Sequence, residues 1–221
     1  MDACKTGWVG IVLDCRRTSA YHASTIVELV SAAEAAGELA VVAIDIPIGL
    51  PDAGRRRADV QARKMVGPRW SSVFITPVRP ALQADDHASA VRVSQELTND
   101  GISIQAFSLK QKILEVDAWV REETHRVVEV HPEVSFARMA GAPLVDSKTT
   151  WAGAERRREL LNEAGIRFVG HLGDAGRAAR VDDVLDAAAA AWSARRVAVG
   201  RAISLPDPPE MFGGLTCAIW A

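Results

Sequence analysis

The sequence predicts an α/β fold, in which helices flank a sheet with parallel pairing at its middle. An apolar run at residues 7–16 and a possible partner strand at 18–24 are followed by an Ala-rich helical segment and then by the apolar run VVAIDIPI at residues 41–48. A strand that is apolar on both faces and directly follows a helix is typical of a parallel sheet. With 221 residues, 48% of them apolar, the chain can bury a sizeable core. We expect one domain over residues 1–221.

The first elements can be justified in order. Residues 7–16 lead from a glycine into an apolar run, and TSAYHAS at 18–24 is the expected hairpin partner. A helix is expected from about Thr25 to Ala36, because the glycine that follows is a favoured residue after a helix. The strand at 41–48 ends in IPIGLP, where proline and glycine favour a turn.

Residues 52–125 have helical patterns and loops instead of strands. The patterns are GRRRADVQARKMVG, DDHASAVRVSQELTND and SIQAFSLKQKILEVDAWVREE, with the loop PRWSSVFITPVRP between the first two. This stretch exceeds what a crossover between parallel strands needs. We therefore expect a helical insertion that covers the ends of the strands.

The sheet is expected to resume with HRVVEV at residues 125–130, followed by a short helix from Glu133 to Met139. A charged helix at 151–165 and a short strand at 166–170 come next. An Ala-rich helix follows at about 181–199. We expect PDPPE to form a turn and LTCAIW, near the end of the chain, to form a final edge strand.

Charge and cysteine usage argue against several classes of protein. With 26 Lys and Arg against 28 Asp and Glu, the net charge of -2 gives no overall attraction to nucleic acid or an anionic membrane. Cys4, Cys15 and Cys217 lack the CxxC spacing of zinc sites and are odd in number. No run of 18 apolar residues and no secretion signal is present. We expect a cytoplasmic protein with no membrane partner; its oligomeric state is not indicated.

Carboxylates stand next to buried elements at Asp2, at Asp45, at Glu129, and at the pair Asp183 and Asp186. Residues three apart on a helix share a face, with Cβ atoms about 5–6 Å apart, so the pair can bind one ligand together. Two carboxylates from a helix and one from a strand end are suitable ligands for Mg²⁺ or Mn²⁺. Such a cluster fits phosphodiester hydrolysis, in which one ion activates water and a second stabilises the leaving oxygen.

Each acid also has a purely structural interpretation. Asp182 or Asp183 can cap the helix, whereas Asp186 lies past the first turn, where Asp is a poor helix former. Asp183 and Asp186 lie opposite the apolar stripe of the helix, which is typical of a solvated face. Several alanines share their side, however, and would let the helix pack closely against a sheet. Asp45 can simply accept hydrogen bonds from the turn that follows it.

The chain contains a set of long, ordered motifs: DACKTGWV, AIDIPIGLP, GPRWSSVFITPVRPAL, VVEVHPEVSF, GAERRRELL and DDVLDAAAAAWSARR. From Asp2 to the final AIW they resemble the motifs of domain-of-unknown-function family 429. That family is described as predicted nucleases of the RNase H fold, related to Holliday-junction resolvases. The resemblance implies an RNase H-like mixed five-stranded sheet in the order 3-2-1-4-5, flanked by helices, with the helical insertion between the fourth and fifth strands.

The resemblance also implies roles for the acids. Asp2 matches the acid of the first strand, Asp45 that of the fourth strand, and Asp183 with Asp186 those of the last helix, all four as ligands of Mg²⁺ or Mn²⁺. Glu129, in the motif EVHPE, is an additional candidate. Because only Met1 precedes Asp2, we expect either a short central strand or a sequence that lacks several residues before it.

Further candidates follow the strand at 125–130 and lie in the insertion. His131 and Glu133 are placed where a histidine can act as general acid or base, although His131 can equally form a turn before Pro132. Arginines of the insertion match the geometry of phosphate, although most of them would be solvated surface. The candidate substrate-binding residues are Arg69, Ser71, Ser72, Arg79 and Lys148.

The leading hypothesis is a metal-dependent nuclease or phosphodiesterase that acts on nucleic acid or on a small phosphorylated substrate. An alternative is a phosphotransferase or nucleotide-binding enzyme of the actin-like or sugar-kinase type. That alternative would need a glycine-rich phosphate turn, of which ACKTGW is only a weak version. A third hypothesis is a non-catalytic binding module whose partner surface is the helical insertion.

Overall fold

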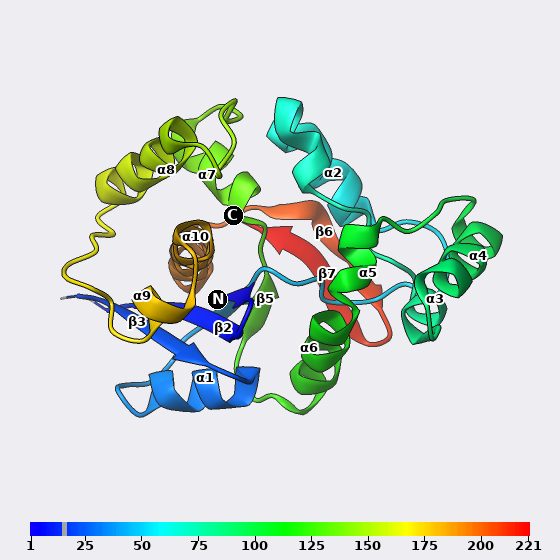
Figure 1. The fold of residues 1–221 in the computed structure, drawn as a ribbon, viewed down its shortest axis with the longest axis horizontal. Coiled ribbons are helices and arrows are strands. Elements are labelled where there is room, and N and C mark those ends of the chain that lie inside the picture. Colours follow the sequence, from blue (N-terminus) through cyan, green and yellow to red (C-terminus); the bar gives the residue numbers. More distant parts are fainter. Residues whose placement is uncertain (15–16) are drawn as a thin grey trace.

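The computed structural model describes residues 1–14 and 17–221. Its strands form two sheets, one of three strands in the order β1-β2-β3 and one of four strands in the order β4-β5-β7-β6. The prediction of a mixed α/β fold is confirmed. The prediction of one five-stranded sheet is wrong, because the pairing is divided between two sheets and the second contains two additional strands (Figure 1).

The first sheet is antiparallel and consists of β1 (Asp2–Cys4), β2 (Gly7–Leu13) and β3 (Thr18–Ala23). The predicted hairpin is thereby confirmed, although Cys15 and residue 16 lie outside the described part of the chain. β2 is buried on both faces: Val9 and Ile11 pack with α10, whereas Trp8 packs with α1. This alternation is the expected result of the two-residue period of a strand.

The second sheet contains β4 (Val42–Ile44), β5 (Val127–Glu129) and β7 (Leu215–Trp220) in parallel, with β6 (Ser204–Phe212) antiparallel to β7. β7 therefore lies inside the sheet instead of at its edge. PDPPE, the predicted turn, belongs to β6, where proline still allows an extended backbone. The strand predicted at 166–170 is not formed; that segment is coil and turn.

Met1 connects the two sheets. Its nitrogen donates to the carbonyl of Ala43 at 2.6 Å, and the backbone N–H of Asp45 donates to the carbonyl of Met1 at 3.1 Å. Two backbone hydrogen bonds do not make a continuous pairing of strands, so the two sheets are separate. They nevertheless bring the start of β1 beside the end of β4, and so place Asp2 next to Asp45.

The predicted helices outside the insertion are confirmed to within a few residues. They are α1 (Ile26–Glu34), α7 (Pro132–Ala140), α8 (Trp151–Glu163) and α10 (Val181–Ala198), and a short α9 (Ala175–Ala178) precedes α10. The helices between β4 and β5 are α2 (Arg57–Val66), the 3-10 helix η1 (Gly67–Ser72), α3 (Arg79–Gln83), α4 (His87–Thr98), α5 (Ile104–Ser108) and α6 (Lys110–Glu122). Across the described residues, no helix has the length and apolar character needed to cross a membrane.

The central helix, α10, is covered on several sides. In Figure 1 it lies between the first sheet and the pair α7 and α8. Its run of alanines from Ala187 to Ala191 is buried, and Val184 and Leu185 join the core with Val9. Because alanine side chains are small, the backbone of α10 can approach β2 and β4 closely.

The helices between β4 and β5 pack in two separate hydrophobic cores. Ile113 and Val116 of α6 share a core with α1 and β4. α3, α4 and α5 have a smaller core of their own, and in Figure 1 α3 and α4 lie at the far end of the molecule from α8. α2, η1 and α5 remain close to the ends of β4 and β5, where they form one side of a pocket.

The close packing of α10 gives a test of the fold. Replacing Ala188, which is fully buried, by Leu should lower the free energy of unfolding by about 1–3 kcal/mol, because the added atoms overfill the core. Ala198→Leu makes the same change at an exposed position on the same helix and should leave stability nearly unchanged. Urea unfolding would compare the two, and equal losses would argue against this packing.

Candidate functional site

Two buried glutamates at the ends of elements are paired with arginines. Glu129, the last residue of β5, accepts hydrogen bonds from Arg56 at 2.8 and 2.7 Å and from the backbone N–H of Ile48 at 2.7 Å. The same guanidinium donates to Asp59 at 2.5 Å. Arg56 is fully buried. The guanidinium therefore offsets part of the negative charge that Glu129 and Asp59 bring inside the protein.

Glu133, in the first turn of α7, has a similar arrangement. Arg157 of α8 donates from Nη2 to both of its carboxylate oxygens, at 2.6 and 2.7 Å, and is fully buried. Glu129 and Glu133 line the pocket, but their negative charges are used to hold α2 against β5 and α8 against α7. The structure does not bring them into a common cluster with the other predicted acids.

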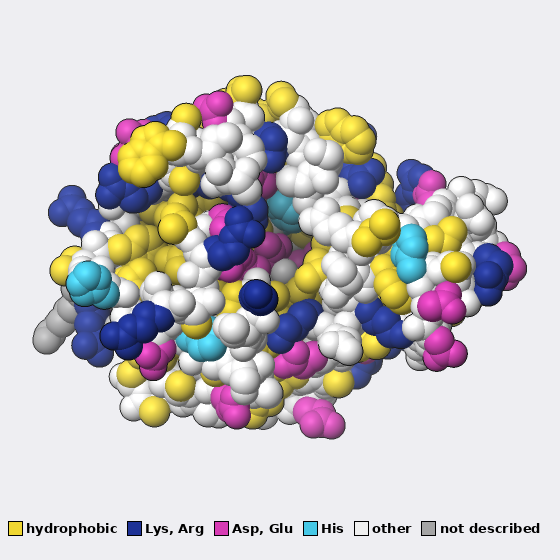
Figure 2. Space-filling model, in the orientation of Figure 1, with side chains coloured by type: hydrophobic (Ala, Val, Ile, Leu, Met, Phe, Trp, Pro, Cys, Tyr) yellow, Lys and Arg dark blue, Asp and Glu magenta, His cyan; other side chains and the backbone are white. Residues whose placement is uncertain are grey.

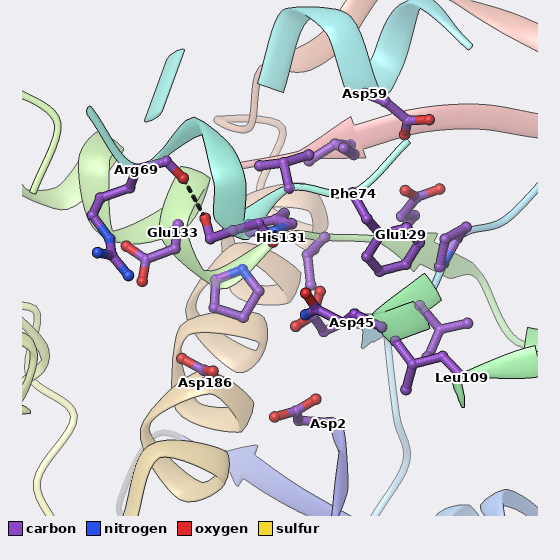
Figure 3. Close-up of a pocket in the computed structure, with 18 of the residues that line it drawn as sticks. Asp2, Asp45, Asp59, Arg69, Phe74, Leu109, Glu129, His131, Glu133 and Asp186 are labelled. Atoms are coloured by element: carbon purple, nitrogen blue, oxygen red, sulfur yellow. Dashed lines mark hydrogen bonds between the residues drawn. The ribbon is translucent and has the colours of Figure 1, made fainter. Parts of the chain in front are cut away.

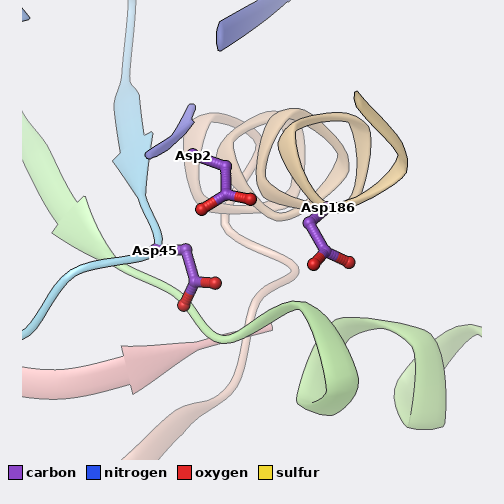
Figure 4. Close-up of side chains that lie close together, drawn as sticks. All are labelled: Asp2, Asp45 and Asp186. Carbon is purple, nitrogen blue, oxygen red and sulfur yellow. The ribbon is translucent and has the colours of Figure 1, made fainter. Parts of the chain in front are cut away.

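Asp2, Asp45 and Asp186 form a different group, in which carboxylate oxygens from all three lie within 4.8 Å of one another. Figure 4 shows them converging from β1, from the residue after β4 and from the second turn of α10. Within residues 1–14 and 17–221, no arginine pairs with any of the three. Lys148 alone donates a hydrogen bond to the group, to Oδ2 of Asp186.

The second oxygen of Asp186 lacks a partner. Oδ1 is buried and accepts no hydrogen bond from any residue that the structure describes, although the residue is only 1% exposed. A buried carboxylate oxygen without a donor costs free energy, so it indicates a ligand that the protein chain does not supply.

Burial and mutual repulsion raise the pKa values of the three acids. Burial raises the pKa of Asp45 to about 6 and that of Asp186 to about 7. Burial, followed by the charges of Asp45 and Asp186, raises the pKa of Asp2 well above its ordinary value. Like charges this close cannot all ionise at little cost near neutral pH. A cation among them would remove that cost.

Lys148 lies in the segment between α7 and α8 and is partly buried, with its side chain 34% exposed. Burial tends to lower its pKa, but the charges of Asp186, Asp2 and Asp45 outweigh burial and raise the pKa above its ordinary value. Lys148 therefore carries its positive charge at neutral pH. It compensates one of the three carboxylates. The amino group of Met1 also interacts with Asp2 and Asp45, but burial lowers its pKa to about 6, so it contributes little positive charge at pH 8.

The cluster lies in a pocket of about 360 Å³. Figure 2 shows acidic and histidine side chains in a hollow at the centre of one face, with basic side chains beside it. Figure 3 shows how Arg69, His131 and Glu133 lie around the carboxylates. Ten of the predicted site residues line this pocket: Asp2, Asp45, Arg69, Ser71, Ser72, Glu129, His131, Glu133, Lys148 and Asp186.

Two predicted site residues lie elsewhere. Asp183 accepts a hydrogen bond from the backbone N–H of Arg180 at 3.0 Å, and so caps the N-terminus of α10 one turn before Asp186. Asp182, the other candidate cap, pairs instead with the Arg180 side chain at 3.1 Å. Arg79 makes a bidentate ion pair with Asp117, in which Nη1 and Nη2 each donate to one carboxylate oxygen at 2.8 Å.

His131 is partly buried in the pocket wall, directly before Pro132 opens α7. Burial lowers its pKa, so the imidazole is neutral at pH 7. Nε2 lies 3.4 Å from the carbonyl oxygen of Ser72, which favours the proton on that nitrogen. Nδ1 has no partner within the described chain and is then free to accept a proton.

The donor set fits a hard divalent cation. Three carboxylates supply the oxygen ligands that Mg²⁺ and Mn²⁺ prefer, and the unpartnered Oδ1 of Asp186 is one such ligand. With Lys148 opposite, the three carboxylates keep a net charge of about −2 when ionised, which one divalent ion balances.

The sequence pattern does not reveal the roles of Arg56 and Arg157. Most arginines of the insertion are expected at a solvated surface, but Arg56 is buried because Glu129 closes an apolar strand. A glutamate at the end of a buried strand needs a positive partner, and that requirement was a usable signal. Its partner could not be chosen from three adjacent arginines, Arg55 to Arg57, by pattern alone.

The comparisons with known proteins give one finding. The model of a family described as a protein of unknown function, DUF429, matches residues 1–211. The match includes every residue of the carboxylate cluster, together with Lys148 and His131. No curated protein and no solved structure matches the chain.

The arginine pairs give a test of the pocket walls. Arg157→Met leaves Glu133 buried without its partner and should lower the free energy of unfolding by about 3–5 kcal/mol. Arg158→Met is the same change at the neighbouring residue, whose side chain is 58% exposed, and should leave stability unchanged. Denaturant unfolding would compare the stability of the two variants. An Arg157→Met protein as stable as the wild type would contradict the role of this pair.

The raised pKa values predict how stability depends on pH. Because the pKa of Asp45 is raised to about 6, the folded protein holds a proton that the unfolded chain releases from about pH 4 upward. The free energy of unfolding therefore falls as pH rises through this window. Asp45→Asn should raise the free energy of unfolding by about 1–3 kcal/mol at pH 8 and change it little at pH 4.

Urea unfolding in a metal chelator would measure this difference. Asp85→Asn, at an exposed position, is the matched control and should show no such pH dependence. A loss of stability in Asp45→Asn at pH 8 would mean that the carboxylates do not repel one another as described.

Proposed function

The chain belongs to the DUF429 family, a family of unknown function, and from its site we propose that it is a divalent-metal-dependent phosphodiester hydrolase. The observation that carries the proposal is the convergence of Asp2, Asp45 and Asp186 without arginine partners in the described chain. Every nearby acid that only builds the pocket wall is paired with an arginine. Three carboxylates that share a single lysine in the same pocket are costly unless they bind a further cation.

In the proposed function Asp2, Asp45 and Asp186 hold Mg²⁺ or Mn²⁺. When bound, such an ion supplies an activated water and stabilises negative charge on the phosphoryl group. Asp183 remains a predicted ligand, since it lies one turn from Asp186, but it would have to release the N-terminus of α10.

The remaining pocket residues have roles toward the phosphate and the proton. Lys148 and Arg69 line the pocket beside the carboxylates and would donate to the nonbridging oxygens, whereas Arg56, which also lines it, is held by Glu129 and Asp59. Nε of Arg69 is buried and has no acceptor among the described residues, so it is available for this contact. Ser71 lies on the same segment as Arg69 and adds a hydroxyl group, whereas the hydroxyl of Ser72 already donates to the carbonyl of Arg69 at 2.7 Å.

His131 would take the proton that the attacking water loses. Its neutral imidazole offers Nδ1 as acceptor. As the oxygen of water bonds to phosphorus, the P–O bond to the leaving alcohol breaks. The leaving oxygen takes up a proton from solvent. The products are a phosphate monoester and an alcohol, and no further reactant is needed.

The phosphotransferase alternative has less support. Within ACKTGW, Lys5 and Thr6 form a two-residue turn between antiparallel β1 and β2, not a loop that leads into a helix. Gly7, the first residue of β2, has a packing reason, because a Cβ there would lie 2.1 Å from the carbonyl oxygen of Ala23. The glycine is thereby explained without a phosphate.

The proposal is tested by titrating the folded protein with Mn²⁺ and Mg²⁺ in a calorimeter at pH 8. The wild type should bind, and Asp45→Asn should bind at least about tenfold more weakly, because a direct ligand is lost. Mn²⁺-dependent hydrolysis of bis(p-nitrophenyl) phosphate should fall in parallel.

Asp85→Asn serves as the matched control in both assays and should behave as wild type. Circular dichroism would establish that each variant is folded. If the folded wild type binds neither ion, the metal-dependent mechanism is wrong.

A further inference from the structure

The pocket has an apolar side that the proposed hydrolysis does not use. Phe74 and Leu109 line it, and the exposed amide of Gln105 lies at its border. Figure 3 shows Phe74 and Leu109 on one side of Asp45, and Arg69 on the opposite side. The carboxylates therefore lie between a cationic side and an apolar side.

The apolar side is built from segments between β4 and β5, and it is fixed in place. Phe74 packs against the core of α1 and β4 and also against the core of α3, α4 and α5. Leu109, between α5 and α6, packs against the first of these cores. Both side chains remain partly exposed toward the pocket. Fixed apolar groups on a concave wall, with one amide beside them, are typical of sites that bind a flat organic group.

The depth of the cluster restricts what can reach it. Asp2 is 8% exposed and Asp186 is 1% exposed, so a phosphate must enter the pocket to meet them. The volume of about 360 Å³ is near the lower end of small-molecule sites, which span about 300–1,000 Å³. A phosphate on a small molecule can enter such a space more readily than one held in the stiff backbone of a duplex. The net charge of -2 also gives no general attraction for a long polyanion.

We propose that this pocket takes a small phosphate ester that carries an aromatic group. The phosphate lies between the carboxylate cluster and the cations Arg69 and Lys148, and the aromatic group lies against Phe74 and Leu109. This assignment names a substrate class for the proposed hydrolase and rests on it. It sets the molecule apart from enzymes that act on duplex nucleic acid.

The test compares two stable ligands that differ in the organic group. Phenyl phosphate and methyl phosphate are titrated into the Mn²⁺-loaded protein and into the metal-free protein. In the Mn²⁺-loaded wild type, phenyl phosphate should bind about tenfold more tightly, because its ring is buried against the apolar side. In Leu109→Ala this preference should fall to about twofold or less.

Ile104→Ala is the matched control, because Ile104 is 76% exposed on α5 and does not line the pocket. Its preference for phenyl phosphate should equal that of the wild type. Gln105→Ala, an exposed change, gives a second variant that does not threaten folding. This variant should weaken the binding of phenyl phosphate more than the binding of methyl phosphate.

Three results would overturn the assignment: equal binding of the two ligands, a preference unchanged in Leu109→Ala, or displacement of phenyl phosphate by an equal concentration of a DNA duplex. Failure of the hydrolase proposal is distinguishable. In that case the preference for the phenyl group persists while Mn²⁺ promotes no hydrolysis of bis(p-nitrophenyl) phosphate.

Discussion

A carboxylate taken out of water needs another charge or a set of donors to offset its lost hydration, and this constraint organises the centre of the protein. Buried arginines supply the opposite charge for Glu129 and Glu133. For Asp2, Asp45 and Asp186, Lys148 supplies only part of the opposite charge that is needed. The same physical requirement therefore separates residues that hold the pocket together from residues that are left for a ligand.

The walls and the floor of the pocket depend on different contacts. Arg56 fastens the start of α2 to the end of β5, and Arg157 fastens α8 to α7. The floor depends on the two backbone bonds of Met1 and on the small side chains that let α10 approach the strands. Residues from the beginning, middle and end of the chain are all needed, so the cluster forms only when most of the fold is in place.

Local patterns were sufficient for most of the helices and for the hairpin, because periodicity and capping act over a few residues. They also indicated five acids that lie beside apolar elements, and three of these form the cluster: Asp2, Asp45 and Asp186. They could not give the sheet order, because β7 joins β5 across about 90 intervening residues and no local pattern records which strands are neighbours. They also could not separate Asp183 from Asp186. Both share one helix face, and only the position of the helix end turns the first toward the backbone and the second toward the cluster.

The outer strand of the second sheet carries three prolines, Pro206, Pro208 and Pro209, within the nine residues of β6. Its pairing with β7 shifts register between Leu205 and Glu210, so these prolines fall in the irregular stretch. A proline has no N–H to offer an incoming strand, and an irregular edge fits a flat one poorly. β6 thus makes the free border of this sheet a poor template for another molecule, which protects the protein against strand-to-strand aggregation at high concentration.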